Sequence, residues 1–254
     1  MKSFRTVLTC ALAVAATGSA AFAQATATLP SAQEVLAKYV EVTGGEAVLK
    51  NLKSRTVKGK MMIKEAGIGG TIVSMAAAGG KSYTEVNIDG IGKELQGSDG
   101  ETYWAVSNFT GTRILEGAEK DQVVKENDFL SDLHPEKYYE SMKVTGTEKV
   151  GDDECYKVEK KKKDGDVQTD FYSVKTGLLL KSMMPVTTPV GKLEIVTMVS
   201  DYRDVDGMKI SFKSEQKLPN NMTQSITLES VEINKEISAD KFALPETIQK
   251  MKDK

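Results

Sequence analysis

The sequence predicts a mainly β protein, built on one wide and curved antiparallel sheet with a few helices packed against it. Apolar and polar residues alternate with a period of two in long segments, most clearly at Met208, Ile210 and Phe212, which is typical of strands with one buried face. Turn pairs such as Asp89-Gly90 and Asp99-Gly100 recur at intervals of about ten residues, a spacing that indicates consecutive antiparallel strands. A sheet of this width curls strongly.

The first 23 residues have the pattern of a secretory signal peptide. Lys2 and Arg5 precede a mainly apolar run over residues 7–16, and Ala21-Phe22-Ala23 provides a small-residue cleavage motif. The apolar run is too short to span a membrane. We therefore expect cleavage after Ala23, export to the periplasm, and a mature chain (residues 24–254) that folds as a single domain.

Composition narrows the function classes. Cleavage after Ala23 would remove two basic residues and no acid, which takes the formal net charge from −2 to −4. A nucleic-acid-binding protein needs a basic face, so we expect no nucleic-acid partner. Cys155 is then the one cysteine left, which excludes an internal disulfide. We expect no transmembrane segment in the mature chain.

Three helices are predicted. Ser31 and Glu34 form a capping-box pattern at the start of the first, which Gly44-Gly45 ends. A short second helix covers 46–52. A helical insert covers about 117–134 and ends at His134-Pro135.

The remaining segments are predicted strands. They run from about residue 55 to 115 and again from about 142 to 233. The most apolar part is a meander over 178–217, with a hairpin turn at Asp206-Gly207. In the last strand the apolar parity shifts between Leu228 and Val231, which predicts a bulge.

The helices are too few to cover so wide a sheet. We predict about ten or eleven strands but only about forty helical residues to cover them. Full closure would give a small barrel that is filled by side chains or holds one ligand, whereas partial closure would leave the helices over the concave face. The mismatch between the width of the sheet and its helical cover indicates a hydrophobic cavity, although the same residues also suit an ordinary core. Its expected wall residues are Val57, Met61, Ile63, Met75, Trp104, Val106, Leu180, Met184, Ile195, Ile210 and Phe212.

Motifs for covalent or metal chemistry are absent from the sequence. His134 is the one histidine, so no zinc cluster or HExxH motif is present. Neither G-x-S-x-G nor a phosphate-binding glycine loop occurs. We expect no catalytic residue, no metal and no cofactor. The run Lys160–Lys163 is interpreted as a solvated strand edge, with contact to acidic lipid headgroups as the alternative.

Several sequence features occur in the same order as in the periplasmic outer-membrane lipoprotein carrier and sorting superfamily, the LolA-like proteins, which this chain resembles. They are the capped first helix, Asp99-Gly100-x-Thr102-x-Trp104, the helical insert, and a long meander that ends at Phe242-x-Leu244-Pro245. The resemblance covers nearly the whole mature chain. It implies a half-open antiparallel barrel with N-terminal and mid-chain helices over its concave face, which holds acyl chains. The arginine–proline pair of the lipoprotein carrier proper has no counterpart here, because Gly80-Lys81-Ser82-Tyr83 stands in its place.

These observations lead to three functional hypotheses. The first is a soluble periplasmic carrier whose partner is the acyl chain of a lipoprotein or lipid, with no enzymatic activity. The second is a protein-interaction or stress-sensing module that has the same fold, binds an envelope protein and transports no cargo. The third is an enzyme acting on a hydrophobic small molecule, which would need a cluster of perturbed lysines or carboxylates in the cavity.

Overall fold

The computed structural model describes residues 28–188, 191–218 and 221–253, so the predicted signal peptide lies outside the described part of the chain. The described residues form one antiparallel sheet of 13 strands. The strands of the first half are β1 (Ser54–Ile63), β2 (Ile68–Ala77), β3 (Lys81–Ile88), β4 (Gly92–Asp99), β5 (Tyr103–Ser107) and β6 (Gly111–Ile114). Those of the second half are β7 (Tyr139–Val150), β8 (Asp153–Lys162), β9 (Val167–Ser173), β10 (Leu179–Thr188), β11 (Gly191–Val205), β12 (Met208–Lys217) and β13 (Thr223–Ile233). The predicted fold class is confirmed.

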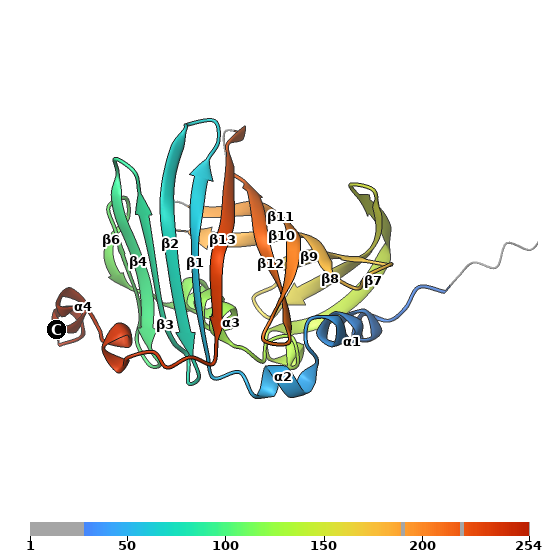
Figure 1. The fold of residues 1–254 in the computed structure, drawn as a ribbon, viewed down its shortest axis with the longest axis horizontal. Coiled ribbons are helices and arrows are strands. Elements are labelled where there is room, and N and C mark those ends of the chain that lie inside the picture. The colour runs from blue at the N-terminus through green and yellow to red at the C-terminus, as the bar shows by residue number, and fades with distance from the viewer. Residues whose placement is uncertain (1–27, 189–190, 219–220, 254) are drawn as a thin grey trace, which may run out of the picture.

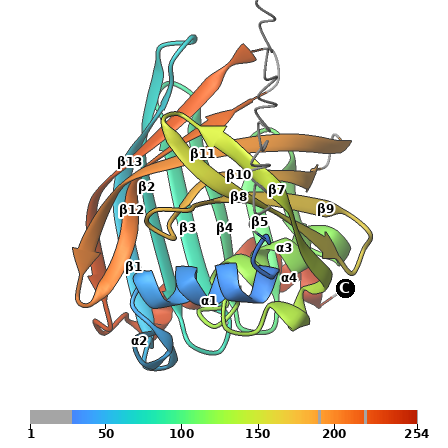
Figure 2. The same ribbon diagram turned by 90° about the vertical axis from the view of Figure 1, so that its right-hand side faces the viewer.

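The sheet is an open barrel whose gap lies between two strands that are consecutive in the chain. The strand order is β6-β5-β4-β3-β2-β1-β13-β12-β11-β10-β9-β8-β7, so the first strand pairs with the last, while β6 and β7 form the two edges. The connection from β6 to β7 contains helix α3 (Gly117–Asn127) and the 3-10 turn η1 (Pro135–Lys137). Figures 1 and 2 show α3 inside the curve of the sheet. A helical segment thus stands where β6–β7 pairing would have closed the barrel.

Two further helices cover the concave face near one end of the barrel. Helix α1 (Ala32–Val42) begins with the predicted capping box, in which the Glu34 amide donates to Ser31 Oγ (3.2 Å) and the Ser31 amide donates to Glu34 Oε2 (2.7 Å). Its apolar stripe packs on Val144 and Val158 of β7 and β8. Helix α2 (Glu46–Lys50) contributes Leu49 to a cluster with β12 and β13. Figure 2 shows α1 lying across the mouth of the barrel.

The C-terminal segment covers the outer face instead. The 3-10 turn η3 (Ala239–Phe242) lies against β3 and β4, and helix α4 (Glu246–Lys252) lies against β6 (Figure 1). Trp104, which is 1% exposed, lies on this outer face. It pairs with Gly97 and is tilted against Tyr83, with the ring centroids 6.4 Å apart.

Two details of the predicted elements are settled by the structure. The bulge expected between Leu228 and Val231 is confirmed, because the β1–β13 register shifts there and leaves Glu229 without a directly opposite residue on β1. The helical insert is shorter than predicted: α3 ends at Asn127, and residues 129–133 form turns. Asp128 ends the helix because its backbone leaves the helical conformation, and its carboxylate accepts the Leu130 amide at 2.9 Å.

Gly97 should be intolerant of a side chain. A Cβ at this position would lie 2.7 Å from both Trp104 Cζ2 and the Ser82 carbonyl oxygen. We expect Gly97→Ala to lower the free energy of unfolding by about 1–3 kcal/mol, the usual cost of overpacking. Gly69→Ala is the matched control, since its Cβ would meet the movable Asp89 carboxylate at 2.9 Å. Equal unfolding midpoints in urea for the two variants would contradict this account.

Candidate functional site

A cavity of about 410 Å³ opens on the concave face between the helices and the sheet. This volume lies within the range of small-molecule sites, about 300–1,000 Å³. One part of its lining is apolar and comes from α2 and the segment after it, the turns after α3, and strands β10 and β12: Leu49, Leu52, Phe129, Leu179, Met208 and Ile210. The other part is polar and comes from α3 and strands β7, β8 and β9.

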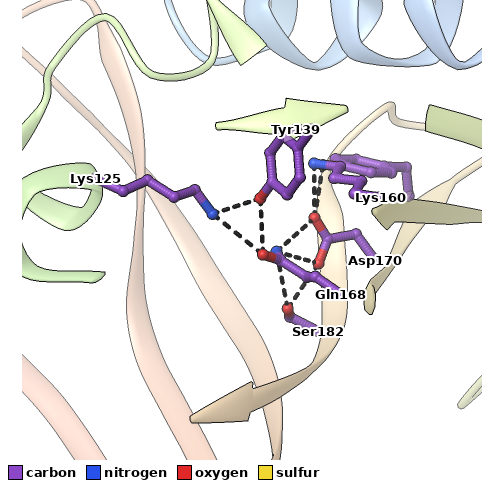
Figure 3. A network of polar contacts seen from close by, with 7 residues as sticks. Lys125, Tyr139, Lys160, Gln168, Asp170 and Ser182 are labelled. Atoms are coloured by element: carbon purple, nitrogen blue, oxygen red, sulfur yellow. Dashed lines mark hydrogen bonds and ion pairs between the residues drawn. The ribbon is translucent and has the colours of Figure 1, made fainter. Parts of the chain in front are cut away.

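The polar side of the cavity is one connected network, which we call the buried polar network. Its members are Lys125, Tyr139, Lys160, Gln168, Asp170, Tyr172 and Ser182. The strand register brings most of them together, because Lys160 pairs with Gln168, and Asp170 pairs with Ser182. Directly paired residues of antiparallel strands share a face. Figure 3 shows the network residues converging from the sheet and from α3.

An ion pair between Lys160 and Asp170 is the centre of the network. Lys160 Nζ lies 2.7 Å from Asp170 Oδ2, and the side chains are only 4% and 3% exposed. Burial opposes ionisation of both groups, but their mutual attraction outweighs it, so the pKa of Asp170 is lowered and that of Lys160 is raised. Tyr172 (3.2 Å), Gln168 (2.9 Å) and Ser182 (2.6 Å) also donate hydrogen bonds to this carboxylate. Such full satisfaction is what a buried charge requires.

Lys125 reaches the network from α3. Its Nζ donates to the Tyr139 hydroxyl and to Gln168 Oε1, the latter at 3.1 Å. The Gln168 amide is oriented by its own donation to Asp170, so its carbonyl oxygen faces Tyr139 and Lys125. Burial, together with the nearby charge of Lys160, lowers the pKa of Lys125 to about 8. Among the described residues Lys125 makes no ion pair.

Seven of the predicted wall residues lie on the concave face. The register places Val57, Met61 and Ile63 on the same face as Arg55, which lines the cavity. Ile195 pairs with Met184, whereas Val196 pairs with Met183 on the other face. Ile210 lines the main cavity, and Met184 lines a neighbouring pocket of about 340 Å³ beside α3. Phe212 shares the face of Ile210 and is covered by the Arg203 guanidinium, 4.4 Å from its ring centroid.

Four predicted wall residues lie on the opposite face. The strand register places three of them on the same face as Thr56, which is opposite to the face of Arg55: Met75, Trp104 and Val106. In β5 the residues are apolar on both faces, and α3 packs on Tyr103 and Ala105.

Leu180 is the fourth of these residues. A register shift between Leu179 and Lys181 turns its side chain toward Phe171 and Cys155, on the outer side of the sheet. Leu179 takes the inner position and lines the cavity.

The buried polar network was missed by the sequence analysis. The interpretation of Lys160 as part of a solvated edge is wrong, because this lysine is 3% exposed and ion-paired. Its neighbour Lys161 does fit that interpretation, with a 47% exposed side chain and an exposed ion pair to Glu140. The available signal was the alternation Lys160, Val158, Tyr156 on one face of β8, opposite Gln168, Asp170 and Tyr172 on β9. Period-two alternation would have put two lysines of the run, Lys160 and Lys162, on the inner face.

The described ranges contain no group of three His, Cys, Asp or Glu residues placed to hold a metal ion. Nor do they contain a helix with the length and apolarity needed to cross a bilayer.

Comparison with known proteins identifies the fold. No protein-family model matches the sequence, and no match is found among curated proteins. Among solved structures, the chain is similar to a DUF1329 family protein from Desulfovibrio piger, with a TM-score of 0.57, 15% identity, and coverage of 83% of this chain and 96% of that one. It is also similar to a LolA superfamily protein from Nitrosomonas europaea, with a TM-score of 0.56, 10% identity, and coverage of 85% and 99%. An outer membrane lipoprotein-sorting protein domain from Vibrio parahaemolyticus gives a TM-score of 0.55 at 12% identity, with coverage of 83% and 95%. The predicted resemblance is confirmed at the level of the fold, which is LolA-like.

Removing one partner of the central ion pair should strongly destabilise the protein. Asp170→Ala leaves the Lys160 ammonium buried without a counter-charge, for which we expect a loss of about 3–5 kcal/mol in the free energy of unfolding. Glu140→Ala, which removes the exposed partner of Lys161, should cost less than about 1 kcal/mol. Urea unfolding of both variants measures the difference, and a loss for Asp170→Ala as small as that for Glu140→Ala would rule out a critical ion pair.

Lys125 should give stability a specific pH dependence. Its pKa is about 8 in the folded state and about 10.4 in an unfolded chain. Between these values the unfolded state binds the additional proton, so Lys125 makes the free energy of unfolding rise with pH. We expect this rise between about pH 8 and pH 10 in the wild type, and a smaller rise in Lys125→Met. Parallel stability curves for the two proteins across that window would show that Lys125 titrates normally.

Proposed function

We propose that the protein is a periplasmic carrier that binds a single amphiphile in its concave cavity, with the apolar chain against the apolar lining and the polar end toward the buried polar network. The observation that carries this proposal is the cavity of about 410 Å³ inside a LolA-like open barrel, with apolar and polar walls. The signal-peptide pattern of residues 1–23 supports export.

The energetics suit a carrier that must both hold and release its ligand. Each buried methylene contributes about 0.8 kcal/mol, so two of them change the affinity by roughly tenfold. Chain burial against Leu52, Phe129 and Met208 therefore gives adjustable binding without any covalent step. One solved structure of the same fold carries the name outer membrane lipoprotein-sorting protein domain. We propose the acyl chain of a lipoprotein or lipid as the cargo class.

Two alternatives remain as outcomes of the tests below. A protein-interaction module for an envelope partner would bind no amphiphile. The enzyme hypothesis now has the feature it required, a cluster of perturbed groups at Lys125, Lys160 and Asp170. Mass spectrometry of an amphiphile recovered after incubation separates carriage from turnover, because a carrier returns it with its mass unchanged.

Two valines on β11 provide a matched test of the binding site. Val199 lines the cavity, whereas Val196 pairs with Met183 on the other face, and both are partly buried. We expect Val199→Trp to weaken binding of a fluorescent fatty acid by about tenfold, because the indole displaces roughly two methylenes of the chain. Val196→Trp should leave the affinity unchanged.

The measurement is a fluorescence titration, accompanied by lipid extraction of the protein purified from its native periplasm. Equal affinities for the two variants would place the site elsewhere. Absence of both co-purified amphiphile and fatty-acid binding would reject the carrier function in favour of an interaction module.

A further inference from the structure

Among the described residues, the Lys125 ammonium contacts two hydrogen-bond acceptors at the edge of the cavity. An ammonium carries three N–H donors, and the two acceptors that Lys125 contacts are the Tyr139 hydroxyl and Gln168 Oε1. Both acceptors are neutral. Within the described part of the chain, no side chain accepts from the third N–H.

The neighbouring carboxylate cannot neutralise this charge. Asp170 is already paired with Lys160, and it accepts hydrogen bonds from Gln168, Tyr172 and Ser182. The network therefore holds one balanced ion pair and one additional cation. A half-buried cation without a counter-ion is unfavourable in a low-dielectric site, so an incoming anion would be stabilised there.

Arg55 adds a second cation to the same cavity. Its guanidinium lies 5.7 Å from the centroid of the Phe129 ring, and it makes no ion pair with any described residue. Burial lowers its pKa, although an arginine stays charged. Arg55 and Phe129 therefore line the cavity together, and within the described residues this second cation also has no carboxylate partner.

The carboxylates that line the cavity are engaged elsewhere or lie beyond ion-pair distance. Glu126 accepts from Gln122 at 3.0 Å, and Asp128 accepts from the Tyr138 hydroxyl at 2.7 Å. Asp132 acts on Lys125 through space, without an ion pair between them.

We propose that Lys125 is the headgroup-recognition residue of the cavity, and that the ligand is a single-chain amphiphile with an anionic oxygen group, a carboxylate or a phosphate. This inference rests on the proposed function, because it assigns the ligand class of the same site. The third N–H donates to the anionic oxygen, and the chain extends along Leu179, Met208 and Ile210. A charge-assisted hydrogen bond of this kind is shorter and stronger than a neutral one.

Protonation of Lys125 should control the selectivity. The groups that act on it most strongly are Lys160 and Asp170 of the network, Lys162 of β8, and Asp132 of the turns after α3, with the Tyr139 hydroxyl in direct contact. Glu126 of α3 also interacts with it through space. The two lysines disfavour the ammonium form and the two aspartates favour it. Preference for an anion should therefore decline above about pH 8, while binding of a neutral chain stays constant.

The test compares probes that share one chain and differ in the headgroup. Dodecanoate, dodecyl phosphate, dodecanol and dodecyltrimethylammonium, each below its aggregation concentration, are titrated into the mature protein by competition with a fluorescent neutral alkyl probe. Inorganic phosphate alone is included to separate a headgroup from a free anion. We expect the two anionic amphiphiles to bind at least tenfold more tightly than dodecanol, and the cation to bind more weakly still.

Three variants assign the preference to one side chain. Lys125→Met should bring dodecanoate to the affinity of dodecanol, while dodecanol itself binds as in the wild type. Lys125→Arg should keep the preference and extend it to pH 10, because arginine stays protonated. Lys120→Gln, on the same helix but outside the cavity lining, should behave as the wild type.

The outcomes separate the two claims. Equal affinity for anionic and neutral probes would overturn the headgroup assignment and leave the carrier function standing. A preference that survives in Lys125→Met would overturn the assignment to Lys125. Binding of inorganic phosphate as tight as that of dodecyl phosphate would overturn the amphiphile as the ligand class. Binding of none of the probes would reject the carrier function itself.

Discussion

The incomplete closure of the sheet determines most of what this protein contains. Thirteen strands run in an unbroken neighbour order from β6 to β7, yet these two strands, consecutive in the chain, do not pair. A concave apolar face of that size must be removed from water. The segment between β6 and β7 provides part of the cover through α3, and the N-terminal helices provide another part (Figure 2). The space they leave is the cavity.

The buried polar network is a consequence of this architecture rather than an addition to it. Strands β8 to β10 turn their inner face toward α3, and the helix supplies Lys125 to a cluster that the sheet has already built. The Lys160–Asp170 pair fixes Gln168, and Gln168 in turn fixes the direction in which Lys125 is held. Because a half-satisfied polar network is less favourable than an apolar core, such a cluster is maintained only if every member has a partner. Among the described residues, Lys125 is the cation of the network that has hydrogen-bond partners but no carboxylate partner.

The two faces of the sheet have separate roles. On the outer face, the C-terminal turn and helix lie against β3, β4 and β6, where Trp104 is buried over Gly97. On the inner face, small residues such as Ala76 and Ala105 make room for the helical cover. The largest aromatic side chain therefore stabilises the outer layer, and the concave cavity is lined by aliphatic side chains, Phe129 and the buried polar network. Trp104 was expected in the cavity wall, but it lies on the outer face and therefore does not line the cavity.

The sequence by itself determined the strand-rich class, the capping box at Ser31, the turns at the glycine pairs and the bulge near Leu228, because each of these depends on neighbours within a few residues. It also assigned Ile210 and Phe212 to the inner face, since clean alternation leaves one choice. It could not assign Trp104 to a face, because a strand that is apolar on both faces shows no alternation of apolar and polar residues. It could not assign Leu180 either, because the register shift between Leu179 and Lys181 reverses the alternation there. Only the tertiary structure brought Lys125 of α3 to Gln168 of β9, 43 residues away. This contact depends on the register of β8 and β9 and on the absence of pairing between β6 and β7, which leaves space for α3. Neither feature can be recognised from a short stretch of sequence.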